Sequence, residues 1–200
     1  VSDVVENYMD EIAKETGRSY KPFSYYGAAD AEYVVVAMGS VTECAEEVVE
    51  HLVAKGEKVG LVKVHLYRPF DTKKFAAAVP ATCKRIAVLD RTIEQGSIYE
   101  PLCLDVQSVY YGKANAPLIV GGRYGLSSKD TTPDLINAVF CNLKAEQPKD
   151  HFVIGINDDI DHTSLEVTET IDVCDPTTTE LLFFGLGSDG TVGACKNISK

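Results

Sequence analysis

The residues whose types and spacing most clearly suggest a chemical role form a glycine-rich turn near the end of the sequence. Residues 185–190 read GLGSDG and fit the GxGxxG pattern of dinucleotide-binding turns. Glycines there allow backbone N–H groups to approach a phosphate closely, ideally at a helix N-terminus. The pattern alone does not decide between a phosphate-bearing ligand and a plain turn. We expect the helix, the second strand and the acidic ribose ligand of a complete dinucleotide-binding unit to lie beyond Lys200.

Two further glycine turns offer weaker anion sites. Residues 121–125, GGRYG, could hold an anion through Arg123 and the glycine amides, although a tight connection whose arginine pairs with a neighbouring carboxylate is favoured. Residues 39–40, Gly-Ser, precede a candidate helix, where a plain capped turn is favoured over an anion site. The sequence leaves the roles of Arg123, Asp130 and Cys195 open.

Metal-ligating and catalytic patterns are incomplete. Asn157, Asp159 and Asp161 alternate as in a calcium loop, but His162 replaces the glycine of the sharp turn and Thr168 replaces the bidentate glutamate. The four histidines show no HxH or HExxH spacing, and the six cysteines form no CxxC pair. We therefore predict no metal site and a solvated acidic loop, with cysteines buried as small hydrophobic residues in a reducing compartment. No Ser/His/Asp triad or Cys/His dyad can be argued from the spacings, so no catalytic residue is predicted.

The composition and net charge limit the kinds of partner that the chain can bind. The formal net charge is -11 at pH 7, and 45% of the residues are hydrophobic. This charge argues against nucleic acid and anionic membranes as partners, because both require clustered Lys and Arg. No apolar run approaches the roughly 20 residues of a membrane span, and no signal peptide opens the chain. We expect a cytoplasmic protein with an ordinary buried core.

Alternating strands and helices must position these turns. Short apolar runs, several of them rich in β-branched residues, predict five strands at residues 33–38, 58–66, 85–90, 118–120 and 151–156. Apolar residues at helical spacing predict helices at residues 2–16, 40–55, 71–78, 100–111 and 133–143. Ser40 and Glu43 match a capping box, and Thr132 is a good N-cap. The predicted fold is α/β, with a mostly parallel five-stranded sheet and helices on both faces.

The two ends lack this regularity. Residues 17–30 show no period and are interpreted as a linker, as are residues 157–180. The apolar run at residues 181–184 predicts a fresh strand. Because the chain opens without Met and this late strand has no predicted partner, we expect an interior piece of a larger enzyme.

Five sequence blocks, in order across nearly all 200 residues, carry a resemblance to a known family. They are VHLYRPF (64–70), IAVLDRT (86–92) with EPL (100–102), GGRYGLSSKD (121–130) with TP (132–133), HF (151–152) with GI (155–156) and DD (158–159), and GLGSDGTVGA (185–194). As a set they resemble the pyruvate:ferredoxin (flavodoxin) oxidoreductases.

This resemblance implies a domain organisation. Residues 1–30 would be the tail of a pyrimidine-binding domain, and residues 31–156 a domain similar to the C-terminal domain of transketolase. Residues 157–180 would be a linker, and residues 181–200 would open a γ domain that binds coenzyme A. The parent enzyme would convert pyruvate and coenzyme A to acetyl-CoA and CO2 and reduce ferredoxin or flavodoxin.

The resemblance also implies where cofactors bind. By this resemblance, the residues expected to contact coenzyme A are Gly187, Ser188, Asp189, Gly190 and Thr191. Thiamine diphosphate, magnesium and [4Fe-4S] clusters would be held elsewhere in the parent, which would be a homodimer. The chain alone would bind none of these cofactors, would be inactive, and would contact other domains of the same polypeptide.

Three functions therefore compete. The first is a structural and docking domain of such an oxidoreductase. The second is the C-terminal domain of a transketolase or of a pyruvate dehydrogenase β chain, although such chains typically end near their last strand. The third is a stand-alone nucleotide-binding module, which rests on the glycine pattern alone.

Overall fold

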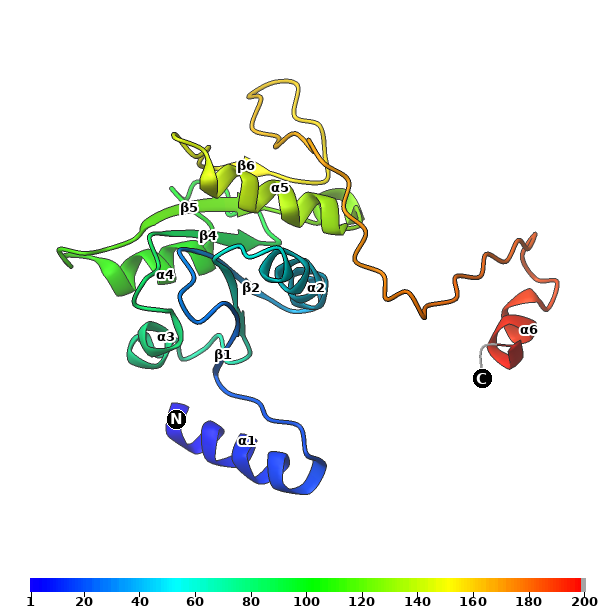
Figure 1. Cartoon of the computed structure of the whole chain (residues 1–200), viewed down its shortest axis with the longest axis horizontal. Helices are drawn as coiled ribbons and strands as arrows, with labels where there is room; N and C mark the ends of the chain where they lie inside the picture. The colour runs from blue at the N-terminus through cyan, green and yellow to red at the C-terminus, as the bar shows by residue number, and fades with distance from the viewer. Residues whose placement is uncertain (199–200) are drawn as a thin grey trace.

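The predicted alternation of strands and helices is present in the computed structural model, which describes residues 1–198 (Figure 1). Ser199 and Lys200, which end the predicted 181–200 segment, lie outside the described residues. In chain order the elements are α1 (Ser2–Thr16), β1 (Phe23–Gly27), β2 (Tyr33–Met38), α2 (Val41–Ala54), β3 (Val59–Val64), α3 (Thr72–Ala78), β4 (Arg85–Asp90), α4 (Pro101–Tyr110), β5 (Leu118–Arg123), the 3-10 turn η1 (Leu126–Ser128), α5 (Pro133–Lys144), β6 (Phe152–Val153) and α6 (Thr191–Ile198).

Within residues 1–198 the sheet has six strands in the order β1-β3-β2-β4-β5-β6. Strands β2 to β6 run parallel, and β1 pairs antiparallel with β3 along one edge. The chain moves from β2 outward to β3, then returns past β2 to β4. The carboxyl ends of β2 and β4 therefore form the topological switch point of a doubly wound sheet. The prediction of five strands missed β1, which lies inside the expected linker at residues 17–30.

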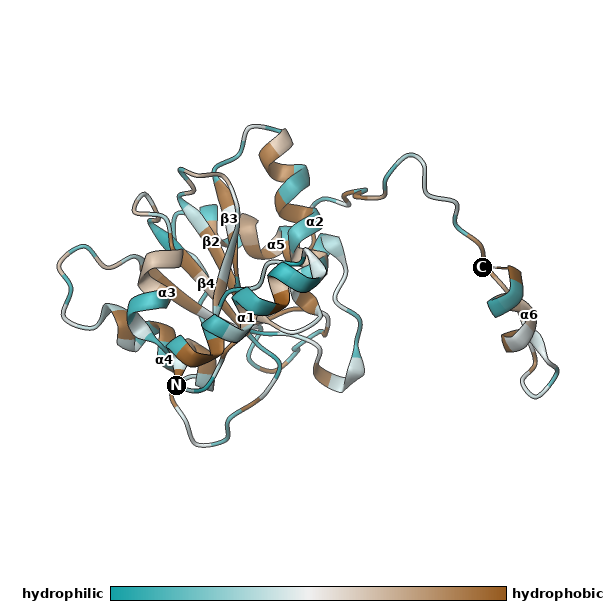
Figure 2. Ribbon diagram, turned by 90° about the horizontal axis from the view of Figure 1, so that it is seen from below, coloured by the Kyte–Doolittle hydropathy of each residue, from teal (hydrophilic) through white to brown (hydrophobic). Residues whose placement is uncertain are grey.

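Two helical layers cover the sheet. Along β2, Val35 and Ala37 face a core that includes apolar residues of α2 and α5, whereas Val34 and Val36 face a core built with α3 and α4. Alternate residues of a strand point to opposite faces, so a continuous apolar run is what a doubly covered strand requires. Figure 2 shows these strands in brown between the helices.

Two local predictions were wrong. Residues 181–184 form no strand, and Leu182 and Phe184 are more than three quarters exposed. Ser40 has helical φ and ψ and its side chain makes no cap; instead, the Thr42 hydroxyl donates to the Gly39 carbonyl (2.7 Å). Thr132 is the N-cap residue of α5 and Pro133 begins the helix, as predicted, although the Thr132 side chain makes no cap hydrogen bond.

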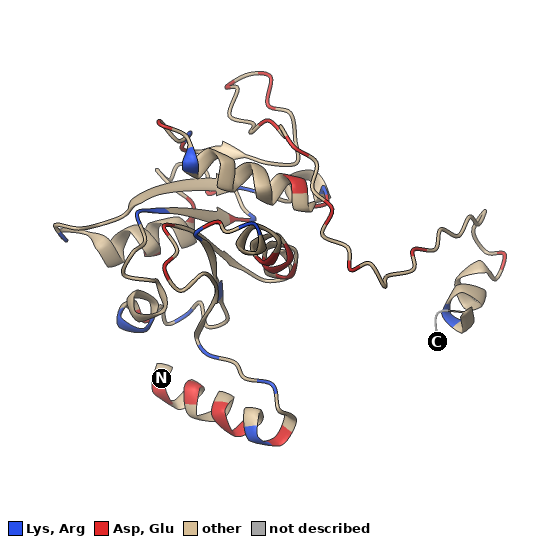
Figure 3. Cartoon of the chain, viewed as in Figure 1, with Lys and Arg blue, Asp and Glu red and all other residues tan. Residues whose placement is uncertain are grey.

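The two terminal helices lie outside the layered core (Figure 1). Helix α1 has no buried residue and is joined to α3 by ion pairs from Lys74 to Asp3 and Glu6. Most charged positions along α1 are acidic, as the red segments of its ribbon show in Figure 3. Helix α6 follows an extended segment and also has no buried residue. Across the described part of the chain, no helix combines the length and apolarity needed to cross a membrane.

Candidate functional site

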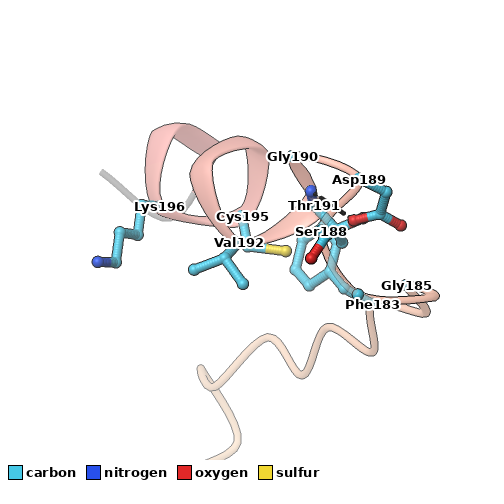
Figure 4. Close-up of a pocket in the computed structure, with 10 residues that line it drawn as sticks. Phe183, Gly185, Ser188, Asp189, Gly190, Thr191, Val192, Cys195 and Lys196 are labelled. Carbon is cyan, nitrogen blue, oxygen red and sulfur yellow. Dashed lines mark hydrogen bonds between the residues drawn. The ribbon is translucent and has the colours of Figure 1, made fainter.

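The glycine-rich turn leads directly into a helix. Thr191 begins α6 immediately after the turn, so the expectation that this helix would lie beyond Lys200 was wrong. Gly187 and Gly190 have φ of 83° and 84°, a region that glycine enters without steric cost. The turn and α6 line a hollow of 590 Å³, with Cys195 and Lys196 on its helical side (Figure 4).

Asp189 organises the turn. One of its carboxylate oxygens accepts from the Thr191 amide and the other from the Leu186 amide, each at 3.0 Å. Hydrogen bonds from the Thr191 side chain and these amides lower the pKa of Asp189 to about 2. The carboxylate thus holds the loop closed and caps the first turn of α6.

The same carboxylate limits what the turn can bind. It already accepts hydrogen bonds from two amides, and its negative charge would repel a phosphate placed beside it. The amides that it leaves for a ligand are those of Gly187, Ser188 and Gly190, at the positive end of the α6 dipole. Lys196 adds a cation to the lining. The arrangement can hold one anionic or amide-bearing group through a few backbone hydrogen bonds.

Arg123 does not join this turn. Its guanidinium is hydrogen-bonded to the buried carboxylate of Glu100, which confirms the favoured prediction of a structural ion pair at residues 121–125. Gly122 at this position lies against the Phe152 ring, leaving no space for a Cβ atom. Gly122 therefore lies within β5, where the missing side chain lets β5 pack against Phe152 of β6.

Two aspartates hold the sheet in ways that the sequence did not predict. Buried Asp90, at the end of β4, accepts from the amides of Leu102 and Cys103 and so caps α4 from a distant segment. Burial raises the pKa of Asp90 despite these bonds. Asp150 accepts from the Gly121 amide (2.8 Å) and from the Tyr99 hydroxyl (2.6 Å). No local pattern reveals such partners, because they lie 12 to 51 residues apart.

The cysteines and histidines form no metal centre. Across residues 1–198, no group of three or more His, Cys, Asp or Glu residues could hold a metal ion. Cys103 is buried, and burial raises the pKa of its thiol to about 12. The prediction of buried cysteines was wrong for most of them: Cys174 is exposed, and Cys44, Cys83, Cys141 and Cys195 are only partly buried.

Comparison with known families decides the assignment. Residues 31–136 match the family model described as pyruvate:ferredoxin oxidoreductase core domain II. The chain belongs to this family. That result confirms the resemblance carried by the five sequence blocks, and it favours the oxidoreductase interpretation over a transketolase or pyruvate dehydrogenase β chain.

Curated members of the oxidoreductase family match nearly the whole chain. The pyruvate:ferredoxin oxidoreductase of Moorella thermoacetica is 55% identical over 197 residues, which is 98% of this chain and 17% of that protein. The pyruvate-flavodoxin oxidoreductase of Enterobacter agglomerans is 52% identical over 199 residues, which is 99% of this chain and 17% of that protein. The chain thus spans about 17% of the length of these relatives.

Among solved structures, the 2-oxoglutarate:ferredoxin oxidoreductase of Magnetococcus marinus, with 2-oxoglutarate, coenzyme A and succinyl-CoA bound, is 21% identical with a TM-score of 0.45. The match covers 62% of this chain and 20% of that chain.

Proposed function

We propose that this chain is a structural and docking segment of an oxidoreductase that converts pyruvate and coenzyme A to acetyl-CoA and CO2 and reduces ferredoxin or flavodoxin. The observation that carries the proposal is the 55% identity to a pyruvate:ferredoxin oxidoreductase across 98% of the chain. Thiamine diphosphate, magnesium and [4Fe-4S] clusters belong to other segments of a homodimeric, cytoplasmic parent protein.

The exposed apolar residues support a docking role. Tyr8 and Ile12 on α1 are 63% and 49% exposed, and Leu182, Phe184 and Leu186 before α6 are between 80% and 101% exposed. Contiguous exposed apolar side chains mark surfaces that other protein segments cover. In this proposal residues 1–30 belong to a preceding pyrimidine-binding domain. Residues 31–156 form a transketolase C-terminal-like domain, residues 157–180 a linker, and residues 181–200 the start of a γ domain.

An activity assay tests the proposal. Pyruvate-dependent reduction of a viologen dye is measured with thiamine diphosphate, magnesium and coenzyme A present, once for the chain alone and once for the full parent polypeptide. We expect turnover by the parent only. Turnover by the chain above a denatured control, or an inactive parent that is fully loaded with cofactors, would contradict the proposal.

Within the parent, we propose that Gly187, Ser188, Asp189, Gly190 and Thr191 contact coenzyme A. The support is the glycine-rich turn, the 590 Å³ hollow and the helix that begins at Thr191. Three amide hydrogen bonds contribute about 0.5–1.5 kcal/mol each. Association itself costs at least about 4 kcal/mol. The turn alone therefore has little net affinity, and further parts of the γ domain must close over the ligand.

Calorimetry with coenzyme A tests this site. We expect no measurable binding by the chain alone, binding by the parent, and weaker binding by the parent with Gly190→Val, because a branched side chain intrudes where the backbone approaches the ligand. Gly112→Val is the matched control, since Gly112 also has positive φ (73°) but lies far along the sequence in an open turn. Normal coenzyme A binding by Gly190→Val, or equal weakening by both variants, would show that the site is wrongly assigned.

A further inference from the structure

A second cavity lies at the topological switch point of the sheet. It measures 170 Å³ and is lined by Ser40 after β2, Arg91 after β4, and Tyr124, Lys129 and Asp130 from the loop after β5. Ligands of open α/β sheets bind in this crevice, outside the carboxyl ends of the strands on either side of the switch point. The coenzyme A proposal does not use these residues.

Arg91 is held in place by a glycine. Gly125 has φ of 63°, and a Cβ atom there would come within 2.8 Å of the Arg91 Nε and 3.2 Å of its Cδ. The arginine stem therefore lies across the bare backbone of Gly125. Tyr124 lines the same cavity, and its hydroxyl donates to the Met38 carbonyl at the end of β2 (3.3 Å). Residues from three strand ends thus meet around the Arg91 side chain at the cavity.

Two cations line this cavity. Most described lysines and arginines make ion pairs with carboxylates or donate to carbonyls, as Lys63, Arg123 and Lys149 do. Within residues 1–198 neither Arg91 nor Lys129 has a carboxylate within 4.0 Å of its charged group, although both line the same cavity as Asp130. Both side chains are exposed, and their meeting in one cavity favours an anionic ligand there.

The start of α2 lies on the other side of the cavity. The Thr42 and Glu43 amides already donate to the carbonyls of Gly39 and Ser40, so they are not offered to a ligand. The Ser40 side chain makes no cap, and its hydroxyl can donate to a ligand beside the positive end of the helix dipole. The anion would lie between this helix end and the Arg91 guanidinium.

A larger hollow continues from the same place. It measures 760 Å³ and shares Lys129 and Asp130 with the switch-point cavity. Asn157 and Glu166 lie on its other side. Carboxylate and amide oxygens accept hydrogen bonds, which suits hydroxyl groups rather than a second anion.

The geometry points to a site for a phosphate monoester that carries hydroxyl groups, such as a sugar phosphate or a nucleoside monophosphate. The phosphate lies among Ser40, Arg91 and Lys129, and the hydroxylated body extends past Asp130 toward Asn157. The switch-point cavity of 170 Å³ has the volume of about six water molecules, enough for a phosphate group. The hydroxylated body requires the larger hollow.

Calorimetry and amide NMR on the chain test this inference with three probes: inorganic phosphate, ribose 5-phosphate and adenosine 5'-monophosphate. Ionic strength is held constant, because the net charge of -11 repels every anion. We expect saturable binding of at least one organic phosphate, tighter than inorganic phosphate, with amide shifts at residues 39–41, 91 and 125. The better organic probe identifies the source of the phosphate. Absence of saturable binding by all three probes overturns the site, and equally tight inorganic phosphate overturns the hydroxyl-binding part.

Variants that remove one positive charge distinguish specific binding at the Arg91 cavity from non-specific attraction of the anion to any cation. Arg91→Gln should weaken organic phosphate binding about 10- to 100-fold, because it removes a charged hydrogen-bond donor. Arg18→Gln removes the same charge from an exposed linker and should leave binding unchanged. Gly190→Val should also leave it unchanged, which separates this cavity from the proposed coenzyme A turn. Equal weakening by Arg18→Gln and Arg91→Gln, or full binding by Arg91→Gln, contradicts the inference.

A glycine pair tests the positioning of Arg91 without removing its charge. Gly125→Ala pushes the arginine stem away and should weaken binding by a factor similar to that of Arg91→Gln. Gly112→Ala places the same residue at a similar φ (73°) with nothing within 4 Å of the added Cβ atom, and should bind normally. Circular dichroism shows that each variant is folded before it is scored. A folded Gly125→Ala protein that binds like the unchanged chain overturns the role assigned to Arg91.

Discussion

Aspartates of the sheet domain, residues 23–156, differ from those of the tail, residues 175–198. In the sheet domain Asp90 and Asp150 accept hydrogen bonds from amides 12 to 29 residues away. In the tail Asp175 and Asp189 accept from amides two or three residues away. Long-range bonds tie separate elements together, whereas short-range bonds only shape a loop.

The segment between the two regions, residues 157–173, is attached to the sheet domain. The Leu165 amide donates to the Val153 carbonyl (3.0 Å), the Ile171 amide donates to the Asp134 carboxylate (2.7 Å), and Ile171 is buried in the core. We therefore expect the sheet domain to fold by itself and the tail to become ordered only against a partner.

Removing one carboxylate from each region should give the largest difference in the free energy of unfolding. Asp90→Ala leaves two buried amides of α4 without an acceptor and should lower the free energy of unfolding by about 2–4 kcal/mol. Asp189→Ala disturbs only the exposed turn and should not move the unfolding midpoint. Urea denaturation followed by circular dichroism measures both variants. Similar midpoints for the two variants would contradict the difference between the regions.

Adding one methyl group in each region should give a smaller contrast. A Cβ atom at Gly122 overlaps the Phe152 ring, so Gly122→Ala should cost about 1–3 kcal/mol through overpacking. Gly193 in α6 has nothing within 4 Å of an added Cβ atom, so Gly193→Ala should leave the unfolding midpoint unchanged. Thermal and urea denaturation compare the two. A neutral Gly122→Ala variant would show that β5 and β6 are less firmly packed than described.

Acidification should change the contributions of Asp90 and Asp189 to the free energy of unfolding in opposite directions. We expect this effect to be the smallest of the three. Burial raises the pKa of Asp90, so this carboxyl takes up a proton in the folded state before it does in the unfolded chain. Its contribution therefore favours the folded state below the unfolded pKa of about 3.8 and is lost as pH rises through the raised value. Hydrogen bonds lower the pKa of Asp189 to about 2, so its contribution is present above about pH 4 and is lost as pH falls toward 2.

Carboxyl carbon NMR resolves the two titrations. We expect the Asp90 resonance to shift at a pH above the ordinary aspartate pKa of 3.8, and the Asp189 resonance to shift near pH 2. Asp90→Asn and Asp189→Asn assign the signals. Coincident midpoints for the two carboxyl groups would remove the electrostatic difference between the regions.

Local sequence patterns predicted the centre of the sheet well. The runs at residues 33–38 and 85–90 match β2 and β4 residue by residue, because a strand covered on both faces must be apolar throughout. Gly17 was correctly read as the end of α1, where its φ is 73°. The predicted pairing of Arg123 with a carboxylate was also confirmed.

The predictions failed where structure depends on distant partners. Strand β1 is defined by its antiparallel pairing with β3, and its sequence FSYYG has no apolar period. The Leu-Leu-Phe-Phe run at residues 181–184 looks like a strand, but no described strand pairs with it. The cavity at Arg91 was not predicted for the same reason, since residues 40, 91, 125 and 129 meet only after the sheet is wound. The assignment of Gly187 to Thr191 as a coenzyme A contact came from the family resemblance and stays a prediction.

Hydrogen exchange, followed by mass spectrometry on the chain alone and on the parent polypeptide with coenzyme A, tests the central claim most directly. In the chain alone, β2, β3 and β4 should exchange slowly, and residues 175–198 should exchange rapidly because their hydrogen bonds are local and exposed. In the parent, the same strands should stay slow and residues 181–198 should become protected. Equal protection of the sheet domain and the tail in the chain alone, or a tail that gains no protection in the parent, would contradict the account of an independent sheet domain with a docking tail.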